Sequence, residues 1–133
     1  DFTGNIQLDP LNPSFDFEII SAFKKDSLEV TNEDRQQLAD LILQRPEEKI
    51  IITHGTDTMM ETGKFLEQKV GSKLIVITGA MRPEMFTNSD ADLNIGSAIA
   101  TANLMQKGVY LAMHGIVKPV SEMKRNMETG KYF

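Results

Sequence analysis

Short runs of apolar, mostly β-branched residues alternate with helix-length segments along this chain. The runs cover residues 49–53 (KIIIT), 74–78 (LIVIT) and 109–113 (VYLAM). Such runs are typical of strands that are buried on both faces of a parallel sheet. Parallel neighbours require a crossover connection, usually a right-handed one through a helix. The pattern therefore predicts an α/β fold in which helices cover a mostly parallel sheet.

The segments between these runs carry helix signals. Residues 32–44 are predicted to be helical, because Thr31 and Asp34 have the spacing of a capping box and Pro46 stops the segment. The other predicted elements are helices over residues 58–70 and 92–106 and a first strand over residues 15–20 (FDFEII). The resulting order is β-α-β-α-β-α-β, which predicts a three-layer α/β/α, Rossmann-like domain.

Composition limits the function classes. The chain has 133 residues, 41% of them hydrophobic, which predicts one domain over residues 1–133. Within this domain, residues 1–14 are predicted to form a loop or flap. Its net charge of −5 argues against a nucleic-acid partner. No apolar run approaches the roughly 18 residues of a membrane span. The sequence has no cysteine, no Gly-x-Gly-x-x-Gly and no Walker loop, so no thiolate metal site and no nucleotide cofactor is expected.

Small and polar residues follow the predicted strands. The segments are residues 54–59 (HGTDTM), 79–83 (GAMRP) and 114–115 (HG). Parallel α/β sheets bind ligands beyond the carboxyl ends of their strands, so a site is predicted there.

The polar group at residues 56–58 has two interpretations. Thr and Asp are common helix N-caps, and this role alone would explain them. Alternatively, the hydroxyl of Thr56 beside the carboxylate of Asp57 holds or attacks a small polar substrate, with Lys124 as a candidate base. Lys124 taken alone is typical of a solvated surface lysine. For His54 and His114, local packing and hydrogen bonding is the preferred interpretation.

These motifs, in this order, resemble the bacterial-type L-asparaginase family. HGTDTM with Glu61 and Thr62 resembles the second signature of the family, and GAMRP resembles the segment after its next strand. The further similarities are Ser89-Asp90 with Asn94, Gly108-Val109, Lys124-x-Asn126 and, more weakly, residues 26–31 (DSLEVT). Together they cover most of the chain from about residue 26 onward.

The resemblance implies hydrolysis of a side-chain amide through a threonine hydroxyl. A Thr oxygen attacks the amide carbon, ammonia leaves, and water frees aspartate. Thr56 would be the second active-site threonine, and Lys124 would lower the cost of deprotonating it. Asp57 would hold the substrate α-ammonium and pair with Lys124. The implied substrate-binding residues are Ser27 for the α-carboxylate, Ala80 through its backbone, Gly55 and Met81.

Two parts of the family pattern are absent from this sequence. They are the first signature, Thr-Gly-Gly-Thr, which we expect just upstream of Asp1, and the smaller C-terminal domain. The resemblance implies asparagine, with glutamine as a close variant, as substrate, and assembly as a dimer or tetramer. A cytoplasmic location is the default expectation, because no signal-peptide pattern is visible. Two alternatives stay open: an inactive or regulatory module that binds an amino acid, and an amidotransferase that deamidates glutamine or a glutaminyl adduct on tRNA.

Overall fold

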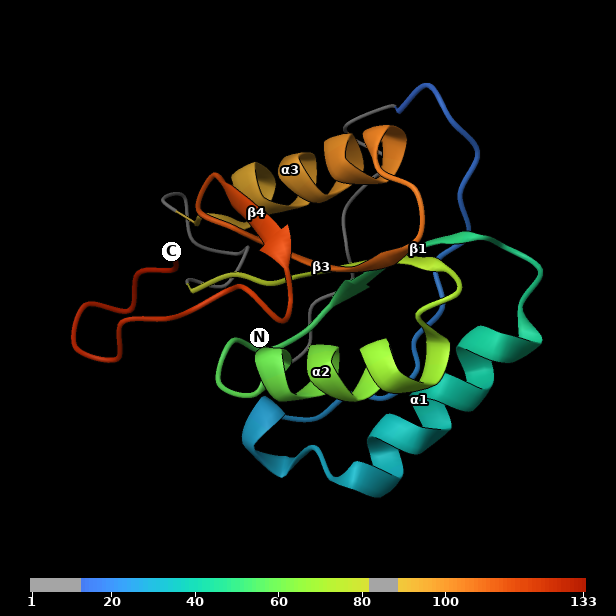
Figure 1. Cartoon of the computed structure of the whole chain (residues 1–133), viewed down its shortest axis with the longest axis horizontal. Helices are drawn as coiled ribbons and strands as arrows, with labels where there is room; N and C mark the ends of the chain where they lie inside the picture. The colour runs from blue at the N-terminus through green and yellow to red at the C-terminus, as the bar shows by residue number, and fades with distance from the viewer. Residues whose placement is uncertain (1–12, 82–88) are drawn as a thin grey trace.

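The computed structural model describes residues 13–81 and 89–133. Residues 1–12 of the loop predicted over residues 1–14, and the end of the GAMRP segment, residues 82–83, lie outside these ranges. The elements are η2 (Ser27–Glu29), α1 (Asn32–Gln44), β1 (Lys49–Thr53), α2 (Met59–Val70), β2 (Leu74–Thr78), α3 (Ala91–Leu104), β3 (Gly108–Met113) and β4 (Ile116–Pro119) (Figure 1). No helix in the described ranges is long and apolar enough to cross a membrane.

The strands form one sheet in the order β1-β2-β3-β4. β1, β2 and β3 run parallel, which confirms the predicted parallel sheet, and β4 pairs antiparallel with β3. Thr53 lies beside Thr78, and Thr78 lies beside Ala112, so the three parallel strands end level with one another. The segments that follow them therefore meet at one edge of the sheet.

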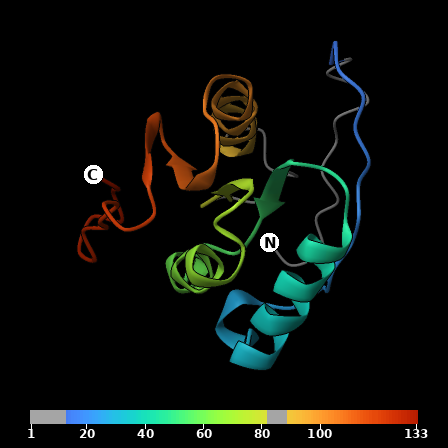
Figure 2. The same ribbon diagram turned by 45° about the vertical axis from the view of Figure 1, so that its right-hand side comes forward.

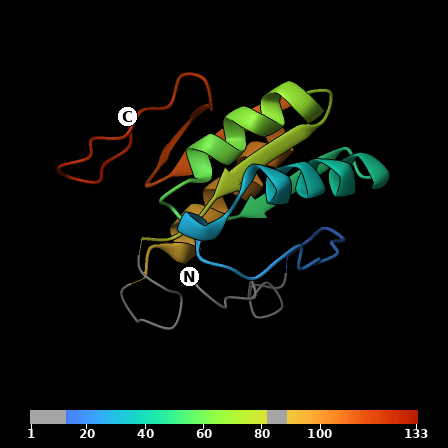
Figure 3. The ribbon, with the colours of Figure 1, turned by 90° about the horizontal axis from the view of Figure 1, so that it is seen from below.

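Helices cover both faces of this sheet, as predicted. α1 and α2 lie on one side and α3 lies on the other (Figures 2 and 3). β2 is buried at every position, because its alternate side chains enter different cores. Ile75 and Ile77 pack in the core under α1 and α2, whereas Leu74 and Val76 pack with alanines of α3. The α/β fold class inferred from the β-branched runs is confirmed.

α1 has the predicted bounds because both of its ends are capped. At its start the Thr31 hydroxyl accepts from the amide of Asp34, and the Asp34 carboxylate accepts from the amide of Thr31. At its end the buried ammonium of Lys73 donates to the carbonyl oxygens of Ile42 (2.8 Å), Arg45 (2.5 Å) and Glu47 (3.0 Å). The Ile42 carbonyl also accepts from the amide of Arg45, and Arg45 and Glu47 follow the helix, so Lys73 ties the last turn of α1 to the residues just beyond it.

The prediction of a first strand over residues 15–20 is wrong. These residues form no regular element, and Phe17 and Ile19 are 40% and 48% exposed. The carboxylate of Glu18 instead pairs with the guanidinium of Arg45 at 2.5 Å. A segment with an alternating apolar pattern forms a strand only when a neighbouring strand pairs with its backbone. In the described sheet the edge strand β1 pairs with β2 alone, so residues 15–20 have no such neighbour.

β4 was missed by the sequence analysis. His114 and Gly115 have φ angles of 53° and 84°, which suit the two central residues of a type I′ turn. This turn reverses the chain and pairs Met113 with Ile116. A short turn ending in glycine between two apolar runs is a hairpin signal that the sequence does contain.

Candidate active site

Two glycines let the segments beyond β1 and β2 approach each other closely. A Cβ atom on Gly79 would lie 2.3 Å from the carbonyl oxygen of His54. A Cβ atom on Gly55 would lie 2.7 Å from Cβ and 2.8 Å from Oγ of Ser27. Only glycine fits at either position, since such distances are far below van der Waals contact. The structure thus brings the predicted site residues Ser27 and Gly55 together, and Gly79 places the segment that carries Ala80 beside them.

Thr56, Asp57 and Thr58 are not explained by helix capping. Thr58 occupies the N-cap position of α2 but makes no capping bond with its side chain. Its hydroxyl donates instead to the carbonyl oxygen of Ser27 at 2.6 Å. Thr56 is half-buried and Asp57 is exposed. Within the described ranges, neither the Thr56 hydroxyl nor the Asp57 carboxylate makes a hydrogen bond or ion pair, so both groups are open to a ligand.

Ser27 is held against this loop by a short 3-10 turn. The carboxylate of Asp26 caps the turn by accepting from the amide of Leu28 at 3.0 Å. Ser27 is 3% exposed, and its Oγ has no hydrogen-bond partner. A buried hydroxyl without a partner is unusual in a folded protein. The local fold therefore buries Ser27 next to Gly55 with unused bonding capacity.

His54 is built into a buried hydrogen-bond chain. Its Nδ1 lies 2.8 Å from the carbonyl oxygen of Gly55, and its Nε2 lies 2.9 Å from Oγ1 of Thr62. Arg35, itself buried, donates from Nε to the same Thr62 oxygen at 2.9 Å. Burial holds the pKa of His54 below its ordinary value, and the charge of Arg35 acts in the same direction. The prediction that His54 packs and hydrogen-bonds locally is confirmed.

A second network holds the segment after β2. The buried Asn94 side chain donates to the carbonyl oxygen of Gly79 (2.8 Å) and to Asp90 (2.9 Å) and accepts from the amide of His114 (2.9 Å). The Asp90 carboxylate accepts from the amide of Met81 at 3.0 Å and pairs with His114 Nε2 at 2.7 Å. The sequence motifs included Asp90 and Asn94, but their function as a clamp on residues 79–81 was not predicted.

The predicted pairing of Lys124 with Asp57 is absent from the described structure. Lys124 is exposed and its ammonium makes no hydrogen bond or ion pair with a described residue. Its neighbour Arg125 reaches the site instead and donates from Nη1 to the carbonyl oxygen of Thr56 at 3.1 Å. The pairing of Lys124 with Asp57 stays a prediction, because both side chains are exposed and neither makes a hydrogen bond or ion pair with a described residue.

Three buried side-chain atoms lack a hydrogen-bond partner in the part of the chain that the structure describes. They are Ser27 Oγ, Arg125 Nε and Tyr132 Oη. Ser27 contacts Gly55, Arg125 contacts Thr56, and Tyr132 packs against Arg125. An unsatisfied buried polar group costs about 1–3 kcal/mol. Their concentration at one end of the sheet indicates a place prepared for a polar ligand.

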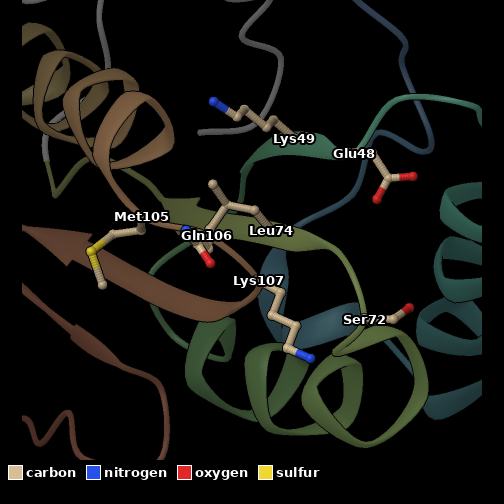
Figure 4. A pocket seen from close by; sticks show the side chains of 7 residues that line it. All are labelled: Glu48, Lys49, Ser72, Leu74, Met105, Gln106 and Lys107. Carbon is tan, nitrogen blue, oxygen red and sulfur yellow. The ribbon is translucent and has the colours of Figure 1, made fainter.

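A pocket of about 200 Å³ lies elsewhere (Figure 4). Its lining residues come from the segments that lead into β1, β2 and β3: Glu48, Lys49, Ser72, Leu74, Met105, Gln106 and Lys107. These are the amino ends of the parallel strands, whereas ligands in such sheets bind at the carboxyl ends. The pocket is therefore distinct from the candidate site.

Comparison with known sequences decides the family. The family described as "Asparaginase, N-terminal" matches residues 6–130. The chain belongs to the asparaginase family. That membership agrees with the ordered motifs and with the strand ends at which they meet.

Two relatives of this asparaginase-family chain have different names. A glutamyl-tRNA(Gln) amidotransferase subunit of Methanococcus vannielii is 49% identical over 69 residues, covering 51% of this chain and 16% of the relative. The glutaminase-asparaginase of Acinetobacter glutaminasificans is 41% identical over 83 residues, covering 59% of this chain and 25% of the relative. The matched part is thus a quarter or less of these proteins.

Solved structures show the same arrangement of elements. The thermostable L-asparaginase from Thermococcus kodakarensis superimposes with a TM-score of 0.72 and 27% identity, over 77% of this chain and 32% of that one. The L-asparaginase I from Vibrio cholerae gives a TM-score of 0.73 and 25% identity, over 83% of this chain and 35% of that one. The asparaginase-family chain thus matches about a third of these larger chains.

Proposed function

We propose that the protein containing this chain is an amidohydrolase that converts the side-chain amide of L-asparagine to aspartate and ammonia. One observation carries the proposal: the open hydroxyl of Thr56 and the open carboxylate of Asp57 directly follow Gly55, which packs against the buried, unpartnered hydroxyl of Ser27. This set of groups suits a zwitterionic amino acid better than an apolar ligand. The names of the relatives support an amide substrate.

The proposed chemistry is acyl transfer through a threonine. A threonine Oγ forms a bond to the amide carbon, and its proton passes to the departing nitrogen. The C–N bond breaks and ammonia leaves, which gives an ester on the threonine. Water then adds to the ester carbon, and cleavage of the C–O bond releases aspartate and restores the hydroxyl. Backbone N–H groups must stabilise the oxyanion in both steps.

Each site residue has a proposed task in this reaction. Thr56 supplies a hydroxyl, Asp57 holds the substrate ammonium, and Ser27 donates to the substrate carboxylate. Ala80 contributes its backbone near the scissile amide, while Gly55 and Met81 border the substrate. Lys124 stays a prediction, and its exposed position makes it the first residue to test against its neighbour.

Ammonia release by the full-length protein tests the proposal. We expect release from L-asparagine, and a loss of at least about a hundredfold in kcat for Thr56→Ala, with partial recovery in Thr56→Ser. Thr53→Ala is the matched control, because Thr53 is exposed at the end of β1 outside the site. Thermal unfolding checks that each variant is folded. No ammonia above a no-enzyme control, with asparagine and glutamine both supplied, would overturn the proposal.

The similarity to part of an amidotransferase supports a second candidate function. In that case the protein would release ammonia from glutamine, and the ammonia would amidate an activated glutamyl group carried by tRNA. The net charge of −5 argues against direct tRNA contact by this chain. A comparison of kcat/KM for asparagine and glutamine, with and without charged tRNA, separates the two functions.

An inert binding module is the third candidate. It predicts that calorimetry detects binding of an amino acid, abolished by Asp57→Asn, while no ammonia forms. Assembly as a dimer or tetramer and a cytoplasmic location also stay predictions. A sedimentation measurement that shows only monomer would contradict the first of these.

A further inference from the structure

We propose that His114 is a positioning residue for the backbone of Ala80, and that it acts through the carboxylate of Asp90. The imidazole and this carboxylate link the turn after β3 to the segment after β2. The kinetic part of the inference rests on the proposed amidohydrolase function, in which Ala80 contributes its backbone near the scissile amide. The structural part rests on hydrogen bonds that can be measured without any substrate.

The two peptide groups that flank Ala80 are both held by side chains at the start of α3. The carbonyl oxygen of Gly79 accepts from Asn94 at 2.8 Å, and the amide of Met81 donates to Asp90 at 3.0 Å. The N–H and C=O of a trans peptide point in opposite directions, so each bond also fixes the direction of one Ala80 group. Within the described ranges, neither the N–H nor the C=O of Ala80 makes a hydrogen bond. The network therefore orients both backbone groups of Ala80 and leaves them open to a ligand.

One carboxylate oxygen of Asp90, its Oδ2, is the centre of this network. It accepts from the amide of Met81, from Nδ2 of Asn94 (2.9 Å) and from Nε2 of His114 (2.7 Å). An ionised carboxylate only accepts hydrogen bonds, so Nε2 carries the hydrogen of the neutral ring. Because the donors share one acceptor atom, a displacement of that atom changes all of these bonds. The imidazole thus holds the oxygen at the place where it meets the Met81 amide.

His114 is itself anchored through its backbone and its ring. Its amide donates to Oδ1 of Asn94 at 2.9 Å. Its ring meets the ring of the buried Tyr132 edge-on, at 6.1 Å between ring centres. The type I′ turn fixes its backbone at a φ of 53°. The imidazole can therefore orient the Asp90 carboxylate although 33% of its side chain is exposed.

Histidine is not the preferred residue for this position of the turn. Asn-Gly is the strongest sequence for a type I′ turn, because asparagine tolerates a positive φ well. An asparagine side chain, however, ends one bond before the position of an imidazole Nε2. The chain thus has a residue that suits the turn less and reaches Asp90 better. Residues held at positive φ by their surroundings are concentrated at functional sites.

NMR of the full-length protein tests the structural part. Labelling with 13C-carbonyl glycine and 15N-alanine reports on the Gly79–Ala80 peptide bond, which is the one Gly-Ala step in this sequence. We expect His114→Asn to shift this signal by more than its linewidth, because Asp90 loses a donor. Val117→Thr is the matched control: Val117 is exposed on the same hairpin, and its replacement should leave the signal in place. An unmoved signal in His114→Asn, or equal shifts in the two variants, would overturn the inference.

Labelling with 15N-histidine tests the contact with Asp90 directly. This sequence has two histidines, and the loss of one signal in His114→Asn identifies the ring of His114. In the parent protein above neutral pH we expect the hydrogen on Nε2 and a bare Nδ1. A hydrogen on Nδ1, or equal amounts of the two tautomers, would overturn the inference.

Ammonia release from asparagine tests the kinetic part. We expect His114→Asn to lower kcat by about tenfold and to change KM by less than about threefold, because the groups proposed to bind the α-ammonium and α-carboxylate are unchanged. His114→Gln carries an amide nitrogen as many bonds from the backbone as Nε2 and should recover part of kcat. The Tm of His114→Asn should equal or exceed that of the parent, whereas a merely structural role would lower kcat and Tm together. A kcat equal to that of the parent in His114→Asn would overturn the kinetic part.

The two proposals fail in different ways. If the parent protein releases no ammonia from asparagine or glutamine, the amidohydrolase function fails, and the NMR measurements still decide whether His114 positions Ala80. If the parent is active and His114→Asn matches it in kcat and in the Gly79–Ala80 signal, the assignment of His114 fails and the function stands. If His114→Asn does not fold, His114→Gly, which also suits a positive φ, replaces it in each comparison.

Discussion

The hydroxyl of Thr62 lies 2.9 Å from Nε2 of His54 and donates its hydrogen to that nitrogen. This direction follows from the carbonyl oxygen of Gly55, which can only accept, so that the Nδ1 atom 2.8 Å from it carries the hydrogen of the neutral ring. Nε2 of His54 is therefore unprotonated, and Nδ1 carries the hydrogen that it donates to the carbonyl oxygen of Gly55. The Gly55 carbonyl thus fixes the tautomer of His54, and the Thr62 hydroxyl, which also accepts from Arg35, holds the ring at the start of the loop of residues 54–58.

Replacement of Thr62 should destabilise the fold. Thr62→Val keeps the shape but leaves Nε of Arg35 and Nε2 of His54 without this partner in a buried place. We expect the free energy of unfolding to fall by about 1–3 kcal/mol, measured by urea denaturation. Thr101→Val is the control, because the buried Thr101 bonds only to a carbonyl of its own helix. Equal losses of unfolding free energy in the two variants would contradict the hydrogen-bond chain from Arg35 through Thr62 to His54.

The stability of the protein should depend on pH through His54. Because the pKa of His54 in the folded chain is lowered by burial, the unfolded chain binds the proton more readily. The contribution of neutral His54 to the free energy of unfolding is complete above the ordinary histidine pKa of about 6.5. It is lost as the pH falls from there towards the lower pKa of the folded chain. We expect His54→Gln to flatten the slope of unfolding free energy between about pH 5 and pH 7. Parallel curves of unfolding free energy against pH for the parent and His54→Gln would refute the contribution of His54.

The two loops should separate when Gly79 acquires a side chain. In Gly79→Ala the new Cβ would meet the backbone oxygen of His54 at 2.3 Å, which neither segment can relieve by a rotamer change. We expect a loss of about 1–3 kcal/mol in unfolding free energy and of ammonia release. Gly96→Ala is the control: its Cβ would meet nothing within 4 Å, and alanine in a helix should stabilise by about 0.5–1 kcal/mol.

Lys73 should contribute to stability although its charge is buried. Lys73→Met would leave the carbonyl oxygens at the end of α1 without their shared donor. We expect a cost of roughly 2–3 kcal/mol, because bonds from a charged donor are stronger than neutral ones. Lys64→Met on the exposed side of α2 should change stability by less than about 0.5 kcal/mol. Denaturation curves for the two variants make the comparison, and similar midpoints would disprove it.

Local signals in the sequence determined the parallel sheet and the three helices, and they indicated the sheet edge at which the candidate site lies. The KIIIT and LIVIT runs favour strands that are covered on both faces. The Thr31–Asp34 capping box starts its helix through local hydrogen bonds that need no tertiary contact. The family, and the strand-end position of Thr56 and Asp57, followed from residues that are contiguous in the chain. Physical chemistry within a few residues is enough for such features.

Only the tertiary structure decided which distant groups meet. Residues 15–20 have the pattern of a strand but no partner, and the turn at His114 pairs residues 116–119, for which no element was predicted, with β3. Lys124 and Arg125 are both basic and adjacent, and of these two side chains the described hydrogen bonds join Arg125 alone to Thr56. The facing of a side chain depends on backbone register, and register is set by contacts between segments far apart in the sequence.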